Sequence, residues 1–114
     1  MIPALIGLSF DILYAWARGD VHALQRMSTP RMAQMFASGL GLAEDDVWRR
    51  AARAWVDREE RMVKGRTDGQ RGYVRFHTHA DHAWVLVFDC GRMPLLDGTT
   101  AMLDRDFESF GAVV

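Results

Sequence analysis

The pattern of apolar positions divides the chain into a helix-forming first half and a strand-forming second half. From Ala4 to Arg18, apolar residues recur at helical spacing in two stripes, so this helix is apolar on nearly all sides and should be buried. Gly19 suits the left-handed end of that helix, and Asp20 suits the N-cap of the next one. The second helix is expected to span Val21 to Met27 and to restart at Thr29-Pro30.

A third helix is predicted from about Ala43 to Met62, where the amphipathic pattern is clearest. Acidic residues precede basic residues by four positions in this segment, a spacing worth roughly a few tenths of a kcal/mol per pair. The pairs are Asp45–Arg49, Asp46–Arg50, Asp57–Arg61 and Glu60–Lys64. The favoured interpretation of these charges is a solvated helix face. The alternative is a patch of Arg49, Arg50 and Arg53 that binds an acidic partner.

After Met62 the chain shows strand patterns separated by turn signals, which predicts antiparallel strands. Asp68-Gly69 is a hairpin signal, because a type I′ turn needs positive φ at both of its central positions. The strand Val63–Thr67 should then pair with Gln70–His79. A second reversal at Ala80-Asp81 should join Tyr73–His79 to His82–Asp89.

The remaining segment completes the predicted sheet. A loop from Cys90 to Met93 should lead to a further turn signal at Asp97-Gly98, followed by a strand at Thr99–Leu103. Phe107 to Val114 is a candidate last strand. Together, the expected helices and strands predict a single α+β domain over residues 1–114. Three N-terminal helices should pack on one face of a curved antiparallel sheet of four to six strands, as a cone or a sandwich.

The assumed pairing places many apolar side chains on both faces of the sheet. One face would carry Val74, Phe76, Val85 and Val87, an ordinary core. The opposite face would carry Tyr73, Arg75, His77, Trp84, Leu86 and Phe88. That face is too apolar to meet water, so a helix, a partner chain or a ligand should cover it. The candidate binding residues are Tyr73, Arg75, His77, Trp84 and Phe88.

The string His77-Thr78-His79-Ala80-Asp81-His82 resembles the H-x-H-x-D-H metal-binding signature of the metallo-β-lactamase superfamily. A strand follows it at once and no histidine lies after His82, so the later ligands of that superfamily are missing and membership is rejected. The favoured interpretation is a polar strand end with ordinary surface histidines. A local zinc site of His77, His79 and His82 is the alternative, because side chains on one side of a hairpin can converge.

Composition narrows the classes of function. The 114 residues carry 14 Lys+Arg against 15 Asp+Glu, and the formal net charge of -1 excludes the chain-wide basic field that drives nucleic-acid or anionic-membrane binding. No segment reaches the roughly 20 apolar residues of a membrane span. The one cysteine, Cys90, cannot form an internal disulfide, which favours a reducing compartment and a cytoplasmic protein. No phosphate loop or assembled catalytic set is visible, so no cofactor is expected and the sequence leans away from an enzyme.

The segment from Phe10 to Met35, FDILYAWARGDVHALQRMSTPRMAQM, is similar to the way many members of the nuclear-transport-factor-2-like superfamily begin. Its aromatic-rich helix is followed by Gly19-Asp20, a short helix and a Pro-marked turn. That superfamily includes ketosteroid isomerases, polyketide cyclases and limonene epoxide hydrolases. The resemblance implies a cone between helices and sheet that contains Tyr14, Trp55, Arg75 or His77, with no catalytic residue carried over by motif.

These observations support three hypotheses about function. The leading one is a small intracellular, non-enzymatic domain that binds a protein partner through its apolar sheet face, as a homodimer. The second is a nuclear-transport-factor-2-like enzyme or binder, which would act on an apolar small molecule by acid–base chemistry in an enclosed pocket. The third is a metal-binding protein that uses the histidine cluster.

Overall fold

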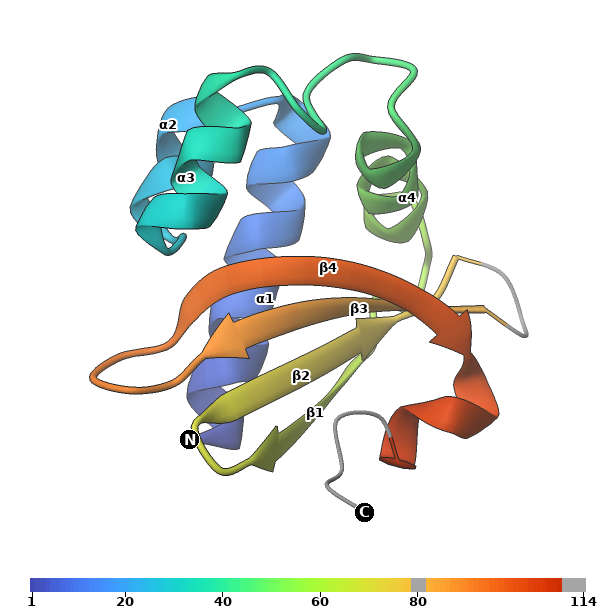
Figure 1. The fold of residues 1–114 in the computed structure, drawn as a ribbon. Coiled ribbons are helices and arrows are strands. Elements are labelled where there is room, and N and C mark those ends of the chain that lie inside the picture. Colours follow the sequence, from blue (N-terminus) through green and yellow to red (C-terminus); the bar gives the residue numbers. More distant parts are fainter. Residues whose placement is uncertain (79–81, 110–114) are drawn as a thin grey trace.

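The computed structural model describes residues 1–78 and 82–109 and has an α+β arrangement (Figure 1). The elements are α1 (Ile2–Arg18), α2 (Val21–Arg26), α3 (Pro30–Ala37), α4 (Val47–Val56), β1 (Val63–Asp68), β2 (Arg71–Phe76), β3 (His82–Asp89), β4 (Leu95–Leu103) and the 3₁₀ helix η1 (Asp104–Ser109). The strands form one antiparallel sheet in the order β1-β2-β3-β4. The predicted α+β class is confirmed, with four strands in the sheet. The expected second helix is two helices, α2 and α3, so four α-helices rather than three precede the sheet in the described part.

Local capping chemistry explains where the first helices begin and end. Gly19 adopts φ 71 and ψ 28 after α1, a left-handed conformation that glycine reaches without a Cβ clash. The Asp20 carboxylate accepts a hydrogen bond from the Ala23 amide at 3.1 Å and so caps α2. Thr29 caps α3, and Pro30 occupies the first position of that helix. The predicted caps at Gly19, Asp20 and Thr29 are confirmed.

Helix α4 is shorter than predicted at both ends. The Asp46 carboxylate accepts a hydrogen bond from the Trp48 amide at 2.8 Å and starts the helix there, not near Ala43. The helix ends at Val56, whereas the prediction extended it to Met62. In the described part of the chain, none of the four predicted acid–base pairs forms an ion pair.

Two arginines of α4 bind backbone carbonyls of neighbouring segments. Arg49 Nη1 donates to the Leu42 carbonyl at 2.8 Å, and Arg53 Nε donates to the Ala17 carbonyl at 3.3 Å. Ala17 lies in the last turn of α1, where the carbonyls lack partners within the helix. The prediction of a solvated charged face is therefore wrong for Arg49, whose Nε is buried. Arg53 also connects α4 to α1, but 41% of its side chain stays exposed.

The β1–β2 hairpin turns one residue later than predicted. Asp68 pairs with Arg71, so the turn residues are Gly69 and Gln70 rather than Asp68 and Gly69. Gly69 has φ 62, and no described residue other than glycine has a positive φ. Positive φ at the first central position alone is typical of a type II′ turn, not of the predicted type I′.

Strands β2 and β3 also pair one residue away from the predicted register. Phe76 lies opposite Trp84, whereas the predicted turn would have placed His77 there. The connection between the two strands comprises residues 77–81, of which 79–81 lie outside the described part, and so does the predicted turn at Ala80-Asp81. Because side chains alternate along a strand, this shift moves every β3 side chain to the opposite face.

The two faces of the sheet therefore differ from those predicted. We call the face toward α1 the inner face and the other the outer face. The inner face carries Val74, Phe76, Trp84, Leu86 and Phe88. The outer face carries Tyr73, Ala83, Val85 and Val87. The predicted faces were wrong for the β3 residues Trp84, Val85, Leu86, Val87 and Phe88.

The Asp97-Gly98 pair lies within β4 and is not a turn. Gly98 pairs with Val87 and Leu96 pairs with Phe88, which leaves Asp97 as an extra residue in a β-bulge. Glycine favours bulges as well as turns, because both need backbone freedom, so the dipeptide alone does not distinguish them.

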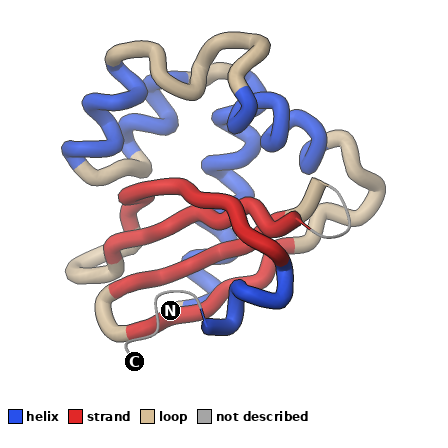
Figure 2. The backbone as a smooth tube through the Cα atoms, turned by 45° about the vertical axis from the view of Figure 1, so that its right-hand side comes forward, coloured by secondary structure: helices blue, strands red, loops and turns tan. Residues whose placement is uncertain are grey.

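The candidate last strand is also wrong where the structure describes it. Phe107 and the residues after it up to Ser109 belong to the 3₁₀ helix η1, and residues 110–114 lie outside the described part. Figure 2 shows η1 in front of the strands, with α1 behind them. The outer face of the sheet is therefore partly covered by the chain itself.

The side chain of the bulge residue ties the helices to the sheet. Asp97 accepts hydrogen bonds from Thr29 Oγ1 and Arg71 Nη1, both at 2.9 Å, and Arg31 Nη2 lies 3.3 Å from its Oδ1. The Thr29 amide also donates to the Leu96 carbonyl at 2.9 Å. Desolvation raises the pKa of Asp97, but the hydrogen bond from Thr29 and the two arginines outweigh it and hold the pKa below its usual value.

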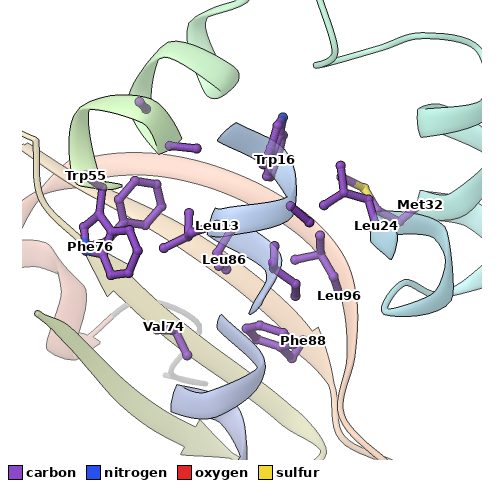
Figure 3. Close-up of a cluster of buried hydrophobic side chains, with 14 of the residues drawn as sticks. Leu13, Trp16, Leu24, Met32, Trp55, Val74, Phe76, Leu86, Phe88 and Leu96 are labelled. Atoms are coloured by element: carbon purple, nitrogen blue, oxygen red, sulfur yellow. The ribbon is translucent and has the colours of Figure 1, made fainter. Parts of the chain in front are cut away.

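Large side chains fill the space between the helices and the inner face (Figure 3). Leu13 and Trp16 from α1 lie between Trp55 of α4 and Leu24 of α2, and Phe76 of β2 belongs to the same cluster. None of these five side chains is more than 2% exposed. Burial of each such side chain contributes about 1.5–3 kcal/mol, so this layer is the main source of stability.

Replacing Gly72 with alanine should destabilise the protein by about 1–3 kcal/mol, because the core has no room for a further methyl group. A Cβ at this position would lie 2.8 Å from Leu5 Cδ1 and 2.9 Å from Cys90 Sγ. Gly7 is the matched control, since nothing lies within 4 Å of its Cβ position in α1. Gly7→Ala should stabilise the helix by about 0.5–1 kcal/mol. Urea unfolding followed by tryptophan fluorescence measures both, and equal effects would contradict the close packing at Gly72.

Replacing Asp97 with asparagine should lower the free energy of unfolding by about 1 kcal/mol at neutral pH. Because the folded-state pKa is depressed, the stabilisation by Asp97 is present above the unfolded-state pKa and is lost as the pH falls through the folded-state value. Urea midpoints measured from neutral pH to about pH 3 should therefore converge for the two proteins on acidification. A constant difference across that range would show that the carboxylate charge is not what matters.

Candidate functional site

The five predicted binding residues do not form one surface. Tyr73 and Arg75 lie on the outer face, whereas Trp84 and Phe88 lie on the inner face. Phe88 is fully buried under the helices. Trp84 packs edge-on against Trp48 of α4, with ring centroids 4.9 Å apart. The structure therefore separates Trp84 and Phe88 from the other candidates.

Tyr73, Arg75 and His77 do come together, at a site on the outer face that η1 completes. Tyr73 is 6% exposed, and it clusters with Ala83, Val85 and Phe107. Arg75 and His77 both contact Asp104, the first residue of η1. We call the outer-face residues Lys64, Arg66, Tyr73, Arg75, His77, Ala83 and Val85 the η1-binding face.

Phe107 anchors η1 to this face. Its side chain is fully buried, although it lies in a short helix at the surface. The Arg66 guanidinium carbon lies 5.5 Å from the Phe107 ring centroid and 4.6 Å from that of Tyr73, and the Arg75 guanidinium carbon lies 5.6 Å from the Phe107 ring centroid. Each such cation–π contact is worth about 0.5–1 kcal/mol at an exposed site. An apolar anchor surrounded by cations is therefore the centre of the site.

Asp104 binds the basic end of the face. Its Oδ1 pairs with Arg75 Nη1 and lies 3.0 Å from His77 Nε2. Desolvation raises the pKa of Asp104, but the hydrogen bond from His77 and the charge of Arg75 outweigh it, so the pKa lies below its usual value. The carboxylate thus stays ionised and paired at neutral pH.

Glu108 makes the second ion pair of the segment. Its carboxylate pairs with Lys64 Nζ on β1. The hydrogen bond from Lys64 lowers the pKa of Glu108, with further contributions from the charges of Arg66 and Arg75. Both partners are more than half exposed, at 52% for Lys64 and 61% for Glu108. Exposed pairs of this kind contribute little stability, and salt screens them.

Sequence reasoning missed the η1 half of this site, namely Asp104, Phe107 and Glu108. A signal was present, because acidic residues flank Phe107 while Lys64 and Arg66 alternate along one strand and Arg75 and His77 along the next segment. The pairs join residues 29 and 44 positions apart, and nothing local indicates which strand face they meet. The match between the acidic residues of η1 and the basic residues of the sheet can be recognised only when the register of the sheet is known.

Of the three histidines in the alternative zinc site, the two that the structure describes lie apart. His77 belongs to the outer-face cluster, while His82 lies beside Trp84, with ring centroids 6.5 Å apart. His79 lies outside the described residues. Within residues 1–78 and 82–109, no three His, Cys, Asp or Glu side chains are placed to hold a metal ion.

The residues that the superfamily resemblance placed in one cone lie on two sides of the sheet. Tyr14 and Trp55 pack together among the helices, with ring centroids 5.8 Å apart. Arg75 and His77 line an open surface hollow of about 180 Å³ together with Arg58. These four side chains therefore share no cavity.

The two edge strands of the sheet differ in charge. β1 carries Lys64, Arg66 and Asp68, and charged residues on an edge oppose pairing with a further strand. From Gly98 to Leu103, β4 carries no charged residue. In the described part of the chain, no backbone hydrogen bond joins this stretch to any segment except β3. The stretch of β4 from Gly98 to Leu103 is thus an open and uncharged edge.

A shallow apolar hollow lies beside this edge. It has a volume of about 340 Å³, and its lining is Val47, Arg50, Ala51, Ala54, Thr78 and Trp84. Ala101 of β4 pairs with Trp84, so the hollow and the open edge adjoin. Val47 is 48% exposed although it is a large apolar residue. Edge and hollow together make a second candidate surface, which we call the β4 edge surface.

Comparison of the chain with protein-family models, with curated proteins and with solved structures gives no match. The function is therefore inferred from the geometry of the described residues. None of the helices in that part of the chain has the length and apolarity to cross a membrane.

Acidification should increase the fraction of molecules in which η1 leaves the outer face, because the folded-state pKa values of Asp104 and Glu108 are both depressed. Their stabilisation is present above the unfolded-state values and is lost as the pH falls through the folded-state values, below about pH 4. Ring-proton NMR signals of Tyr73 and Phe107 should move toward solvent-exposed positions over that range. Asp104→Asn should cause part of this change at neutral pH.

Asp106→Asn is the control for that experiment. Asp106 lies in the same helix but takes part in no ion pair among the described residues. Its replacement should leave the ring signals unchanged. Equal effects of the two asparagine variants would show that net charge, not the Asp104 contacts, holds η1 in place.

Proposed function

We propose that this chain is a non-enzymatic protein-binding domain that forms a homodimer through the β4 edge surface. The supporting observation is the open, uncharged stretch from Gly98 to Leu103. Two antiparallel copies of one edge strand can pair about a two-fold axis, because each then offers the same donors and acceptors to the other. The four strands of each copy would then join into one continuous sheet.

The surroundings of the edge favour a second copy as the occupant. Thr99, Thr100 and Ala101 form the middle of the stretch, and they carry small or β-branched side chains suited to close pairing. Leu103, at the end of the strand, is 40% exposed. In an antiparallel pair, Leu103 of each copy would lie near the Gly98 end of the partner's open stretch. The opposite edge, β1, is less suited to pairing with a second copy because it carries charged side chains.

The chemistry of the described residues supports a binding role over catalysis. Among the described residues, the ionisable groups with shifted pKa values are involved in ion pairs, in a helix cap or in packing. Cys90 is a free thiol with a raised pKa, first because burial disfavours its thiolate. We place such a chain in the cytoplasm, where thiols stay reduced.

Our second candidate function is that of an enzyme or binder of the nuclear-transport-factor-2-like kind, which would hold an apolar small molecule in a cone between helices and sheet. The observation that favours it is the curved sheet, with helices packed on one face (Figure 1). The place where a cone would hold substrate contains Leu13, Trp55 and Phe76, all buried. Saturation transfer NMR with an apolar steroid tests this candidate, and transfer from the methyl groups of Leu13 is the result that it requires.

Light scattering on the purified chain should give twice the 12.9 kDa chain mass. Thr100→Lys should convert the dimer into a monomer with an unchanged circular dichroism spectrum, because a charge at the centre of the edge opposes pairing. Thr67→Lys is the matched control on β1, and it should remain dimeric. A wild-type chain that stays monomeric at NMR concentrations, or a Thr100→Lys variant that stays dimeric, would contradict the proposal.

A further inference from the structure

We propose that the η1-binding face is a recognition site for acidic peptide segments with an aromatic anchor, and that residues 104–109 occupy it as an internal ligand. The site lies on the outer face, whereas the proposed dimer uses the backbone edge of β4. The two surfaces adjoin at Met102, which packs against the cluster around Phe107. Peptide binding at this site does not require dimerisation. The proposed partner is a peptide segment that buries a Phe side chain in the site and carries carboxylates on both sides of that Phe.

The receiving surface is built by the sheet alone. Tyr73 belongs to β2, and Ala83 and Val85 belong to β3. These strands are held from behind by the inner-face core, which contains no residue of η1. Removing η1 would therefore leave the surface in place and expose an apolar patch surrounded by cations.

The cations on this face bind the carboxylates of η1. Lys64, Arg66 and Arg75 lie on neighbouring strands and point to the same face, because Lys64 pairs with Arg75 and Arg66 pairs with Tyr73. With His77 they surround the Phe107 site, while η1 contributes only Asp104 and Glu108 to the ion pairs. A partner segment with an anchor ring and flanking carboxylates would offer the same groups to Lys64 and Arg75.

The internal ligand is held in a way that permits exchange. Within residues 104–109, Phe107 is the buried residue. The ion pairs are exposed or partly exposed, with Asp104 at 41% and Glu108 at 61%. Segments with few buried contacts open at low free-energy cost. A competing peptide in solution can then occupy the face during such openings.

An acidic peptide is favoured over a single-stranded nucleic acid as the partner. Both would use cations and aromatic stacking on a sheet. However, the cations of this face bind carboxylates in η1, and the apolar centre holds the single ring of Phe107. The face instead matches the carboxylate and phenyl groups that it already holds.

The test uses a fluorescein-labelled peptide with the sequence of residues 103–109, titrated with the full-length chain and followed by fluorescence anisotropy. Phe107→Ala in the protein should increase the affinity for the peptide by about tenfold or more over wild type, because the apparent affinity rises with the fraction of open sites. The same peptide with alanine in place of its phenylalanine is the matched control and should bind at least about tenfold more weakly. Adding Arg75→Glu to the Phe107→Ala protein should abolish binding.

A second variant covers the case in which Phe107→Ala does not fold. Asp104→Asn combined with Glu108→Gln keeps the anchor but removes both ion pairs, and it should also bind the peptide more tightly than wild type does. Circular dichroism establishes that each variant is folded. A folded opened variant that does not bind the peptide would overturn the proposal. Binding that survives Arg75→Glu, or a single-stranded oligonucleotide that binds more tightly than the peptide, would overturn it as well.

Discussion

The pairing register between β2 and β3 is the constraint on which the rest of the structure depends. Phe76 opposite Trp84 and Val74 opposite Leu86 place four large side chains toward the helices. A shift by one residue would turn Trp84, Leu86 and Phe88 outward and remove them from the core. The register also decides which β3 residues, Ala83 and Val85, meet η1 on the other face. Both candidate surfaces follow from it.

The two faces of the sheet are covered in different ways. The inner face is closed by four α-helices and a continuous apolar core, so its burial involves much of the chain. Among the residues that the structure describes, η1 covers the outer face through the aromatic anchor Phe107 and a few ion pairs. A small domain gains most of its stability from the larger layer, and the smaller contact is free to serve recognition. This asymmetry is why we look for function on the outer face and at the sheet edge rather than in the core.

The bulge at Asp97 shows how one irregular residue connects the two halves of the fold. Because Asp97 is extra to the ladder, its carboxylate can reach Thr29 and Arg31 at the start of α3 as well as Arg71 on β2. The same part of β4 pairs with the link between α2 and α3 through Leu96. The edge strand is thus fixed at its beginning and open from Gly98 onward, and the open part is the stretch for which we propose self-association.

The sequence by itself determined the features that depend on neighbouring residues. The cap at Asp20, the left-handed Gly19 and the start of a helix at Thr29-Pro30 were predicted correctly, because each depends on hydrogen bonds or φ preferences within a few positions. The α+β class followed from the change of apolar period along the chain. The register, the bulge at Asp97-Gly98 and the place of Phe107 were decided only by the tertiary structure. Each depends on which distant side chains compete for the same buried space, and a local pattern is equally compatible with either outcome.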